Sequence, residues 1–256
     1  QNVDRLFFSH GGIMRGEFDE LYNALFSNAE LYISVVKALA QHHDGMTRTE
    51  ISKVIGANGG TLTRVLTNLE RCDFISRSQN FGCKTKDTIY RLMDFYTLFY
   101  YKFIAQDTSG DEQWWSHNFE SRLVSTWQGL TFEIVCLMHT DCIKKALGIS
   151  GMATEVSSWR KVADDKQRGG QIDLVIKRAD RIVHLCEMKF SKSEYRITDA
   201  YEQLLRQRME LFQSSTKTKL SLVITFVTTY GVADGLHHSI VHSEVTMSQL
   251  FIRNVT

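Results

Sequence analysis

The chain has 256 residues, 43% of them hydrophobic and 23% charged, with 30 lysines and arginines against 29 aspartates and glutamates. This composition is typical of a folded globular protein that buries a core without disulfides or structural metal ions. The net charge of +1 excludes a protein that coats polyanions with its whole surface, so nucleic-acid contact would need a local basic face.

The length predicts one large domain or two modest ones. No run of 18 apolar residues is present, and the N-terminus lacks the basic and apolar regions of a signal peptide, so we expect a cytoplasmic protein. Because the chain opens with Gln1 and not with methionine, we also expect a processed chain or a part of a longer one.

The five cysteines include no CxxC pair, which argues against a disulfide framework and a zinc knuckle. Reduced, mostly buried thiols are therefore expected. One alternative stays open: Cys136, His139 and Cys142 could share a helix face and bind a metal, although the surrounding pattern is apolar.

The beginning of the chain reads as two helices. A short helical segment is predicted within residues 1–28 from apolar residues at helical spacing, namely Phe18, Leu21, Tyr22, Leu25 and Phe26. A second, amphipathic helix is predicted over residues 29–43 and ends at the turn Asp44-Gly45.

Two further helices follow. Thr47 and Glu50 form a capping-box pattern that begins the first of them, which is expected to end near Gly56. The next is predicted over residues 61–74, with an apolar stripe made of Leu62, Val65, Leu66 and Leu69. Short helices joined by tight turns in this way predict a helix-turn-helix core.

Two strand-like runs around a loop at residues 80–86 follow these helices. A hairpin in this place is the wing of a winged helix, so residues 29–93 are predicted to form a winged helix-turn-helix domain. In the functional interpretation the last helix enters a DNA major groove and the wing touches phosphates, through Thr61, Thr63, Arg64, Thr67, Lys84 and Lys86. The alternative is an interdomain or protein-protein module whose lysines are solvated.

The second half has a mixed α/β pattern. Residues 94–115 are read as an aromatic connector, with the domain boundary in the polar stretch at 107–113, and residues 116–256 as the second domain. Its predicted elements give the order αβββαβ. The first is a long helix from Glu120 to Leu147, whose apolar side carries Trp127, Leu130, Ile134, Leu137 and Met138. Strands near 153–162, 171–178 and 181–190, a helix over 199–212 and a strand over 220–230 follow it.

Charged residues on two of these strands form the most informative pattern. Glu187 and Lys189 lie on one face of their strand, and Asp173 lies on the preceding strand. A hairpin centred on Asp180 puts Asp173 opposite Glu187, whereas a centre half a residue earlier makes them diagonal neighbours. In both cases two carboxylates and an ammonium are expected to converge.

Two close carboxylates repel each other unless a cation lies between them, and carboxylate oxygens suit Mg²⁺ or Mn²⁺. Such a metal polarises a phosphodiester and acidifies a bound water, while Lys189 would stabilise developing charge or orient that water. The pattern therefore predicts phosphodiester hydrolysis, with Asp173, Glu187 and Lys189 as catalytic residues.

This arrangement resembles the PD-(D/E)XK nuclease superfamily, which has a restriction-endonuclease-like αβββαβ core. Glu187-Met188-Lys189 matches its tripeptide and Asp173 its leading acid, although Ile172 stands where the superfamily's proline would be. The resemblance implies Glu133 as a further metal ligand, with a helix-surface carboxylate as the alternative. It also implies accessory polar residues on the following helix, namely Gln203 and Arg206, each of which could instead be simply solvated.

Taken over residues 1–253, the chain further resembles the C-terminal half of bacterial and archaeal AAA-type ATPases that end in such a nuclease-like domain. That resemblance implies an upstream ATPase domain as a partner, and no P-loop motif is present in the chain itself. Two functions are expected from it: a DNA-binding protein with a metal-dependent nuclease domain, or a catalytically inactive regulatory or scaffolding module that docks onto the ATPase domain.

Overall fold

The computed structural model describes residues 1–83, 88–163 and 168–251, and it has a mixed α+β fold, as predicted. The chain divides into two compact units: Gln1–Arg77 with Asp87–Trp127, and Ser78–Lys86 with Gln128–Thr256. The division falls inside a helix, beyond the polar stretch at 107–113 where the sequence suggested a boundary. No helix in the described ranges has the length and apolar character needed to cross a membrane.

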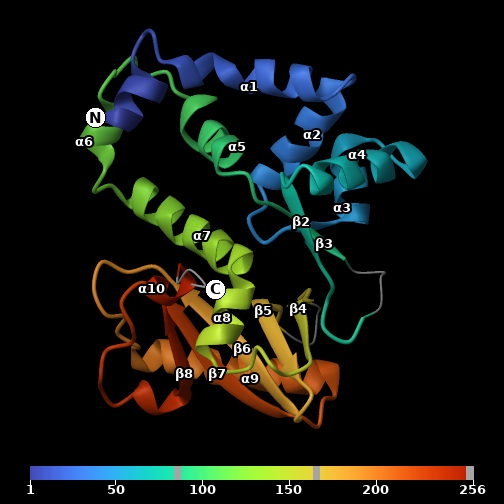
Figure 1. Cartoon of the computed structure of the whole chain (residues 1–256), viewed down its shortest axis with the longest axis vertical. Helices are drawn as coiled ribbons and strands as arrows, with labels where there is room; N and C mark the ends of the chain where they lie inside the picture. Colours follow the sequence, from blue (N-terminus) through green and yellow to red (C-terminus); the bar gives the residue numbers. More distant parts are fainter. Residues whose placement is uncertain (84–87, 164–167, 252–256) are drawn as a thin grey trace. The chain divides into compact units, whose positions relative to one another are not determined.

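The first unit is mainly helical (Figure 1). It also contains a small three-stranded sheet in the order β1-β3-β2. Its elements are η1 (Asp4–Phe8), α1 (Ile13–Leu25), α2 (Ala29–Ala40), β1 (Met46–Thr47), α3 (Arg48–Ile55), α4 (Gly59–Arg71), β2 (Ile75–Ser78), β3 (Ile89–Leu92), α5 (Phe95–Phe99), η2 (Tyr100–Ile104) and α6 (Trp114–Asn118). From α2 to β3 the order is helix, strand, helix, helix and two strands.

The predicted signals at the ends of α3 are confirmed. The Thr47 side chain accepts a bond from the backbone of Glu50, and the Glu50 carboxylate accepts one from the backbone of Thr47 at 2.7 Å. Gly56 ends the helix at a φ of 69°, a left-handed conformation that costs glycine little. The short strand β1, which pairs antiparallel with β3, was not predicted.

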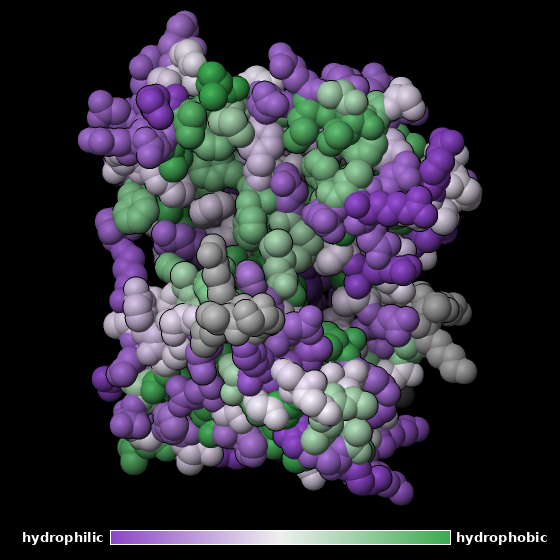
Figure 2. Space-filling model, in the orientation of Figure 1, coloured by the Kyte–Doolittle hydropathy of each residue, from purple (hydrophilic) through white to green (hydrophobic). Residues whose placement is uncertain are grey.

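Helix α4 buries one stripe and exposes the other side. Its buried residues are the four predicted ones, Leu62, Val65, Leu66 and Leu69. Thr61, Thr63 and Arg64 are exposed, and hydrophilic side chains cover much of the right-hand edge where α4 lies (Figure 2). The stripe fixes the helix on the unit, which leaves its polar side open to solvent.

The aromatic segment that begins at α5 packs inside the first unit. Phe99 and Phe103 share a core cluster with Phe8, Ile104 and Val124, and tryptophan rings border it. The ring centroids of Phe8 and Trp114 lie 5.2 Å apart in a stacked arrangement. The segment predicted as an aromatic connector is therefore part of the core of the first unit.

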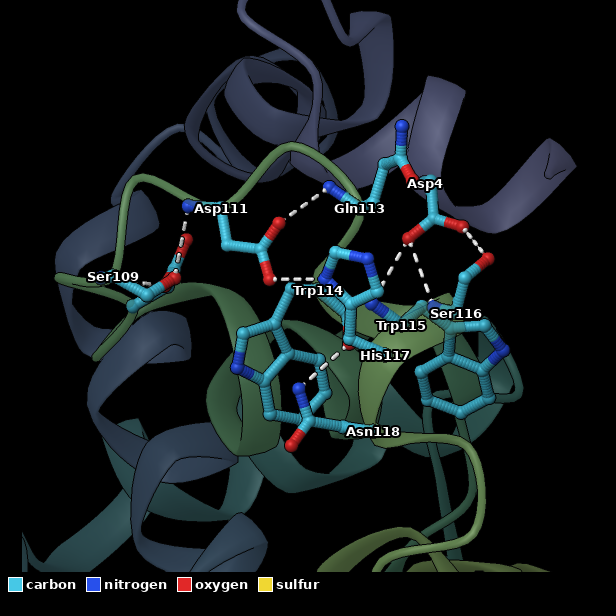
Figure 3. Close-up of polar contacts among 10 residues, drawn as sticks. Asp4, Ser109, Asp111, Gln113, Trp114, Trp115, Ser116, His117 and Asn118 are labelled. Carbon is cyan, nitrogen blue, oxygen red and sulfur yellow. Dashed lines mark hydrogen bonds and ion pairs between the residues drawn. The ribbon is translucent and has the colours of Figure 1, made fainter.

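A buried carboxylate ties the beginning of the chain to α6. Asp4, 6% exposed, accepts bonds from the backbone N–H groups of Trp115 at 2.9 Å and Ser116 at 3.2 Å, and from the Ser116 hydroxyl at 2.5 Å (Figure 3). Burial alone would raise the pKa of Asp4, but these bonds outweigh it and lower that pKa. The carboxylate thus caps a helix whose own N-cap residue, Gln113, supplies no side-chain bond.

Asp4→Ala is expected to lower the free energy of unfolding by about 1–3 kcal/mol, because it leaves N–H groups of α6 without their acceptor. Urea unfolding followed by circular dichroism measures this loss. Asp19→Ala, which removes an exposed carboxylate from α1, is the control and should change stability by less than about 0.5 kcal/mol. Equal stabilities of the two variants would contradict a capping role for Asp4.

The second unit contains a five-stranded sheet in the order β4-β5-β6-β7-β8 (Figure 1). Its elements are the later part of α7 (Arg122–Met138), then α8 (Thr140–Ala146), β4 (Thr154–Lys161), β5 (Gly170–Arg178), β6 (Ile182–Lys189), α9 (Asp199–Thr216), β7 (Ser221–Thr228), η3 (His238–Ile240), β8 (Val241–Thr246) and α10 (Met247–Leu250). The strands β4, β5 and β6 pair antiparallel, whereas β7 runs parallel to both β6 and β8.

Apolar residues cover both faces of this sheet. On one face Leu174, Ile176 and Met188 pack with Phe132 of α7 and Ile143 of α8. On the opposite face the strand residues Val175, Val183 and Leu185 pack with Phe212 of α9. The sheet is therefore the middle of three layers, with α7, α8 and α10 on one side and α9 on the other.

Residues 78–83 belong to the second unit and extend its sheet at the β4 edge. Asn80 forms a parallel bridge with Ser158, and its side chain bonds both the N–H and the C=O of Arg160, at 2.9 and 3.2 Å. The ring of Phe81 lies 4.9 Å from that of Phe212. This segment covers an edge that would otherwise leave backbone groups open to pairing.

The predicted helix from Glu120 to Leu147 is wrong in its extent, because α7 ends at Met138 and α8 begins at Thr140. His139 separates them at a φ of −105° and a ψ of 28°, outside helical geometry. Met138, predicted on the apolar side, is 58% exposed. The strands β4, β5, β6 and β7 and the helix α9 lie close to their predicted ranges. The strand β8 and the helix α10 were not predicted.

Candidate functional site

The β5–β6 hairpin has the register centred on Asp180. Leu174 pairs with Cys186 and Lys177 with Val183. The turn closes on Arg181, which adopts a φ of 73°. This is the register that the sequence predicted to put Asp173 opposite Glu187. These two residues come directly after the Leu174–Cys186 pair, on the side away from the turn.

Glu187 is a buried carboxylate held by three donors. Its Oε1 accepts the hydroxyl of Tyr201 and lies 2.8 Å from Nζ of Lys189, while its Oε2 lies 2.5 Å from Nη1 of Arg208. The Glu187 side chain is 10% exposed, and the two cationic side chains are about a quarter exposed. Because both oxygens carry charge-assisted contacts, the charge of the carboxylate is balanced within the protein.

The neighbours of Glu187 also have shifted pKa values. Partial burial alone would lower the pKa of Lys189, but the adjacent Glu187 carboxylate outweighs burial and raises it, so the side chain stays an ammonium at neutral pH. Burial, and then the charge of Glu187, raises the pKa of Tyr201, whose hydroxyl therefore stays protonated and donates. Nζ of Lys189 lies 5.3 Å from the centre of the Tyr201 ring.

The two donors from α9 were not predicted. Tyr201, Leu205, Arg208 and Phe212 recur at helical spacing and form the face of α9 that packs on the sheet. Gln203 and Arg206, the predicted accessory residues, lie on the exposed side of α9 instead. Gln203 donates to Asp199 at 2.9 Å, and Arg206 pairs with Glu202 at 2.5 Å. The 201–205–208–212 spacing was the signal that could have identified Arg208.

Asp173 lies in an irregular part of β5. Ser157 pairs with Val175 and Trp159 with Ile172, so two residues of β5 face one residue of β4, as in a β-bulge. In a regular strand, Ile172 and Val175 would lie on opposite faces of the sheet. Because of the bulge, both pack beneath α9.

The bulge also determines where the Asp173 carboxylate lies. Its Oδ1 accepts a bond from Nε2 of Gln171 at 2.8 Å, which puts these two side chains on one face. Both alternate with Ile172, whose side chain lies beneath α9, so the Asp173 carboxylate lies on the face away from α9. Glu187, by contrast, contacts α9. The contacts of the described residues bring Glu187 and Lys189 together and give the Asp173 carboxylate another partner, Gln171.

Glu133, the third expected metal ligand, is half-buried on α7. Its charge contributes to the raised pKa of Lys189, after the larger effect of Glu187, which indicates that it lies within electrostatic range of the ammonium. The same charge, added to burial, raises the pKa of Cys136.

The residues around Glu187 do not fit a divalent cation as they are arranged. Mg²⁺ needs open carboxylate oxygens, and here both oxygens of Glu187 are engaged by donors, two of them positively charged. Within the described ranges, no group of three or more His, Cys, Asp or Glu side chains is placed to hold a metal ion. Cys136, His139 and Cys142 are among the side chains in these ranges. Burial raises the pKa of the thiol of Cys186 to about 12, so that thiol is inert.

The expected DNA-binding residues on α4 are accessible. Thr61, Thr63 and Arg64 are exposed and Thr67 is half-buried. Arg48 of α3 donates to the C=O of Gly59 at 2.8 Å and steadies the beginning of α4. Lys84 and Lys86, the expected phosphate contacts, lie outside the described residues.

No protein-family model matches the chain, and no curated protein matches it. The resemblances drawn from the sequence therefore remain proposals.

Proposed function

We propose that this chain is a DNA-binding protein in which a winged-helix unit is joined to a PD-(D/E)XK nuclease-like unit that does not cleave DNA in its described state. The observation that carries DNA binding is the exposed polar and basic side of α4, formed by Thr61, Thr63 and Arg64 on a helix fixed by a buried stripe. A helix presented in this way suits insertion into a major groove.

The order of elements in each unit supports the proposed folds. In the first unit, two helices followed by a hairpin and completed by the short strand β1 are the arrangement of a winged helix. In the second unit, the helix before β4, the three antiparallel strands, α9 and the parallel strand β7 follow the αβββαβ order.

Binding without cleavage is favoured because Glu187 is occupied by Arg208, Lys189 and Tyr201. Mg²⁺- or Mn²⁺-dependent cleavage is the second candidate. It is favoured by the position of Nζ of Lys189, 2.8 Å from the Glu187 carboxylate on the same strand face. It would require Arg208 to release Glu187 and Asp173 to move to the same side of the sheet.

The relation to an upstream ATPase domain is part of the same proposal and rests on the sequence resemblance alone. A purely regulatory or scaffolding module would dock onto that domain without neutralising DNA phosphates. Its apparent affinity for DNA would then be nearly independent of salt, whereas a DNA-binding protein loses affinity steeply as salt rises.

Arg64→Ala is expected to weaken binding to a fluorescent DNA duplex by about fivefold or more, because an arginine in the groove contacts a base edge or a phosphate. Fluorescence anisotropy from 50 to 200 mM salt gives the affinity and its salt dependence. The matched control is Lys37→Ala, which removes one positive charge from the exposed side of α2 and should leave affinity within about twofold.

A salt slope near zero for the wild type, or equal losses in the two variants, would contradict DNA recognition by α4. Plasmid incubated with the wild type and Mg²⁺ is expected to stay intact. Cleavage that disappears in Asp173→Ala would overturn the non-cleaving part of the proposal and favour the second candidate.

A further inference from the structure

The Glu187 carboxylate has one more cationic neighbour than the tripeptide Glu187-Met188-Lys189 implies by itself. A metal site of this type would hold a cation between carboxylates, with the lysine beside it. Here the Glu187 carboxylate meets two cationic side chains, so these three groups sum to one net positive charge. One of the cations, Lys189, belongs to the tripeptide, but Arg208 comes from a separate element, α9.

We propose that Arg208 takes the place of the divalent cation at Glu187 and thereby excludes Mg²⁺ and Mn²⁺ from this site. The inference rests on the proposed nuclease-like nature of the second unit. Arg208 is the partner of Oε2 at 2.5 Å, whereas Lys189 and Tyr201 both contact Oε1. Removing the guanidinium therefore frees one whole oxygen of the carboxylate without disturbing the other.

The packing of α9 holds the guanidinium in place. Leu205 and Phe212 on the same helix face are buried, and Met209 packs in the adjoining clusters. A narrow cavity beside Glu187 is lined by Arg208 together with Leu205, Met209, Ile172 and Ile224. The aliphatic part of the arginine thus lies among apolar groups while its charged end reaches the carboxylate.

The test is Mn²⁺ binding by the full chain, measured by isothermal titration calorimetry with no DNA present. The wild type is expected to show no saturable binding at millimolar Mn²⁺. Arg208→Gln and Arg208→Met, which remove the charge and keep an unbranched side chain out to the δ position, are expected to gain one saturable Mn²⁺ site. Its apparent affinity should be at least about tenfold tighter than the non-saturating binding of the wild type. Adding Glu187→Gln to either variant should abolish that site.

Two controls separate the role of Arg208 from general loss of charge or of structure. Arg206→Gln removes an exposed arginine from the same helix and should behave as the wild type. Arg208→Lys keeps a cation beside Oε2 and should also bind no Mn²⁺. Thermal unfolding identifies which variants are folded, and two substitutions of different polarity are measured so that a folded one is obtained.

Saturable Mn²⁺ binding by the wild type that Glu187→Gln abolishes would overturn the inference, because the metal would then displace Arg208 unaided. A folded Arg208 variant without a new site would overturn it equally. The DNA-binding measurement is independent of these results. A new Mn²⁺ site in a chain that does not bind DNA would support the role of Arg208 and reject the proposed function.

Discussion

Phe212→Ala is expected to lower the free energy of unfolding by about 3–5 kcal/mol, which is typical of a large aromatic side chain removed from a packed core. Phe212 has no exposed surface, and its ring centre lies 4.9 Å from that of Phe81 and 5.4 Å from that of Trp159. It therefore joins α9 to β4 and to the segment at residues 78–83, and its removal leaves a cavity among three elements.

Urea unfolding followed by circular dichroism measures this loss. The matched control is Leu204→Ala on the same helix, where the side chain is 44% exposed and truncation should cost less than about 1 kcal/mol. A loss below 1 kcal/mol for Phe212→Ala would mean that α9 is not held on the sheet as described. The placement of Arg208, one helical turn before Phe212, would then be in doubt as well.

Lowering the pH from 7.5 to 5.0 is expected to destabilise the chain by about 2 kcal/mol through His184 alone. His184 is 1% exposed; its Nδ1 lies 2.8 Å from the Thr225 hydroxyl, and its Nε2 lies 3.3 Å from Nη1 of Arg178. Because a guanidinium only donates, Nε2 must accept and Nδ1 must carry the proton. Burial, reinforced by the charges of Arg178 and His242, lowers the pKa of His184 to about 4.

The folded chain loses stability as the pH falls because the unfolded chain takes up a proton on His184 first. The unfolded chain titrates this imidazole near 6.5, so between that pH and about 4 the unfolded state binds more protons than the folded state. The stabilisation is fully present above pH 6.5, and it is lost by about 1.4 kcal/mol for each pH unit below that value until the folded state also titrates near pH 4.

Other groups titrate in the same pH range, so the change in the free energy of unfolding between the two pH values is compared in the wild type and in a variant that lacks His184. The free energy of unfolding in urea is determined at both pH values for the wild type and for His184→Gln, whose amide can also donate and accept. The wild type should lose about 2 kcal/mol more than this variant between the two pH values. His10→Gln, at an exposed position, should keep the pH dependence of the wild type. Equal losses in the wild type and His184→Gln would contradict a buried neutral imidazole.

Local sequence signals predicted most of the elements because each depends on nearby residues. The bonds between Thr47 and Glu50 lie within four residues, and the α4 stripe needs only helical periodicity. The β5–β6 register was among the predicted ones for the same reason, since a short turn fixes which residues face one another.

The site depends on contacts between distant residues, which local sequence signals do not encode. The position of Asp173 follows from a bulge in the pairing of β4 with β5, which the sequence of β5 alone does not encode. Arg208 and Arg206 differ by two residues, and only the packing of Leu205 and Phe212 decides which of them faces the sheet. Likewise, the bridge from Asn80 to Ser158 joins residues that are 78 positions apart in the chain.

An anomalous difference map from crystals of the wild-type chain grown with MnCl₂ would show directly whether Arg208 or a metal ion occupies Glu187. We expect no manganese peak at the Glu187 carboxylate, and we expect Nη1 of Arg208 within hydrogen-bond distance of Oε2. A peak about 2 Å from a Glu187 oxygen, with Arg208 turned away and Asp173 on the same ion, would contradict this expectation and restore the metal-dependent nuclease.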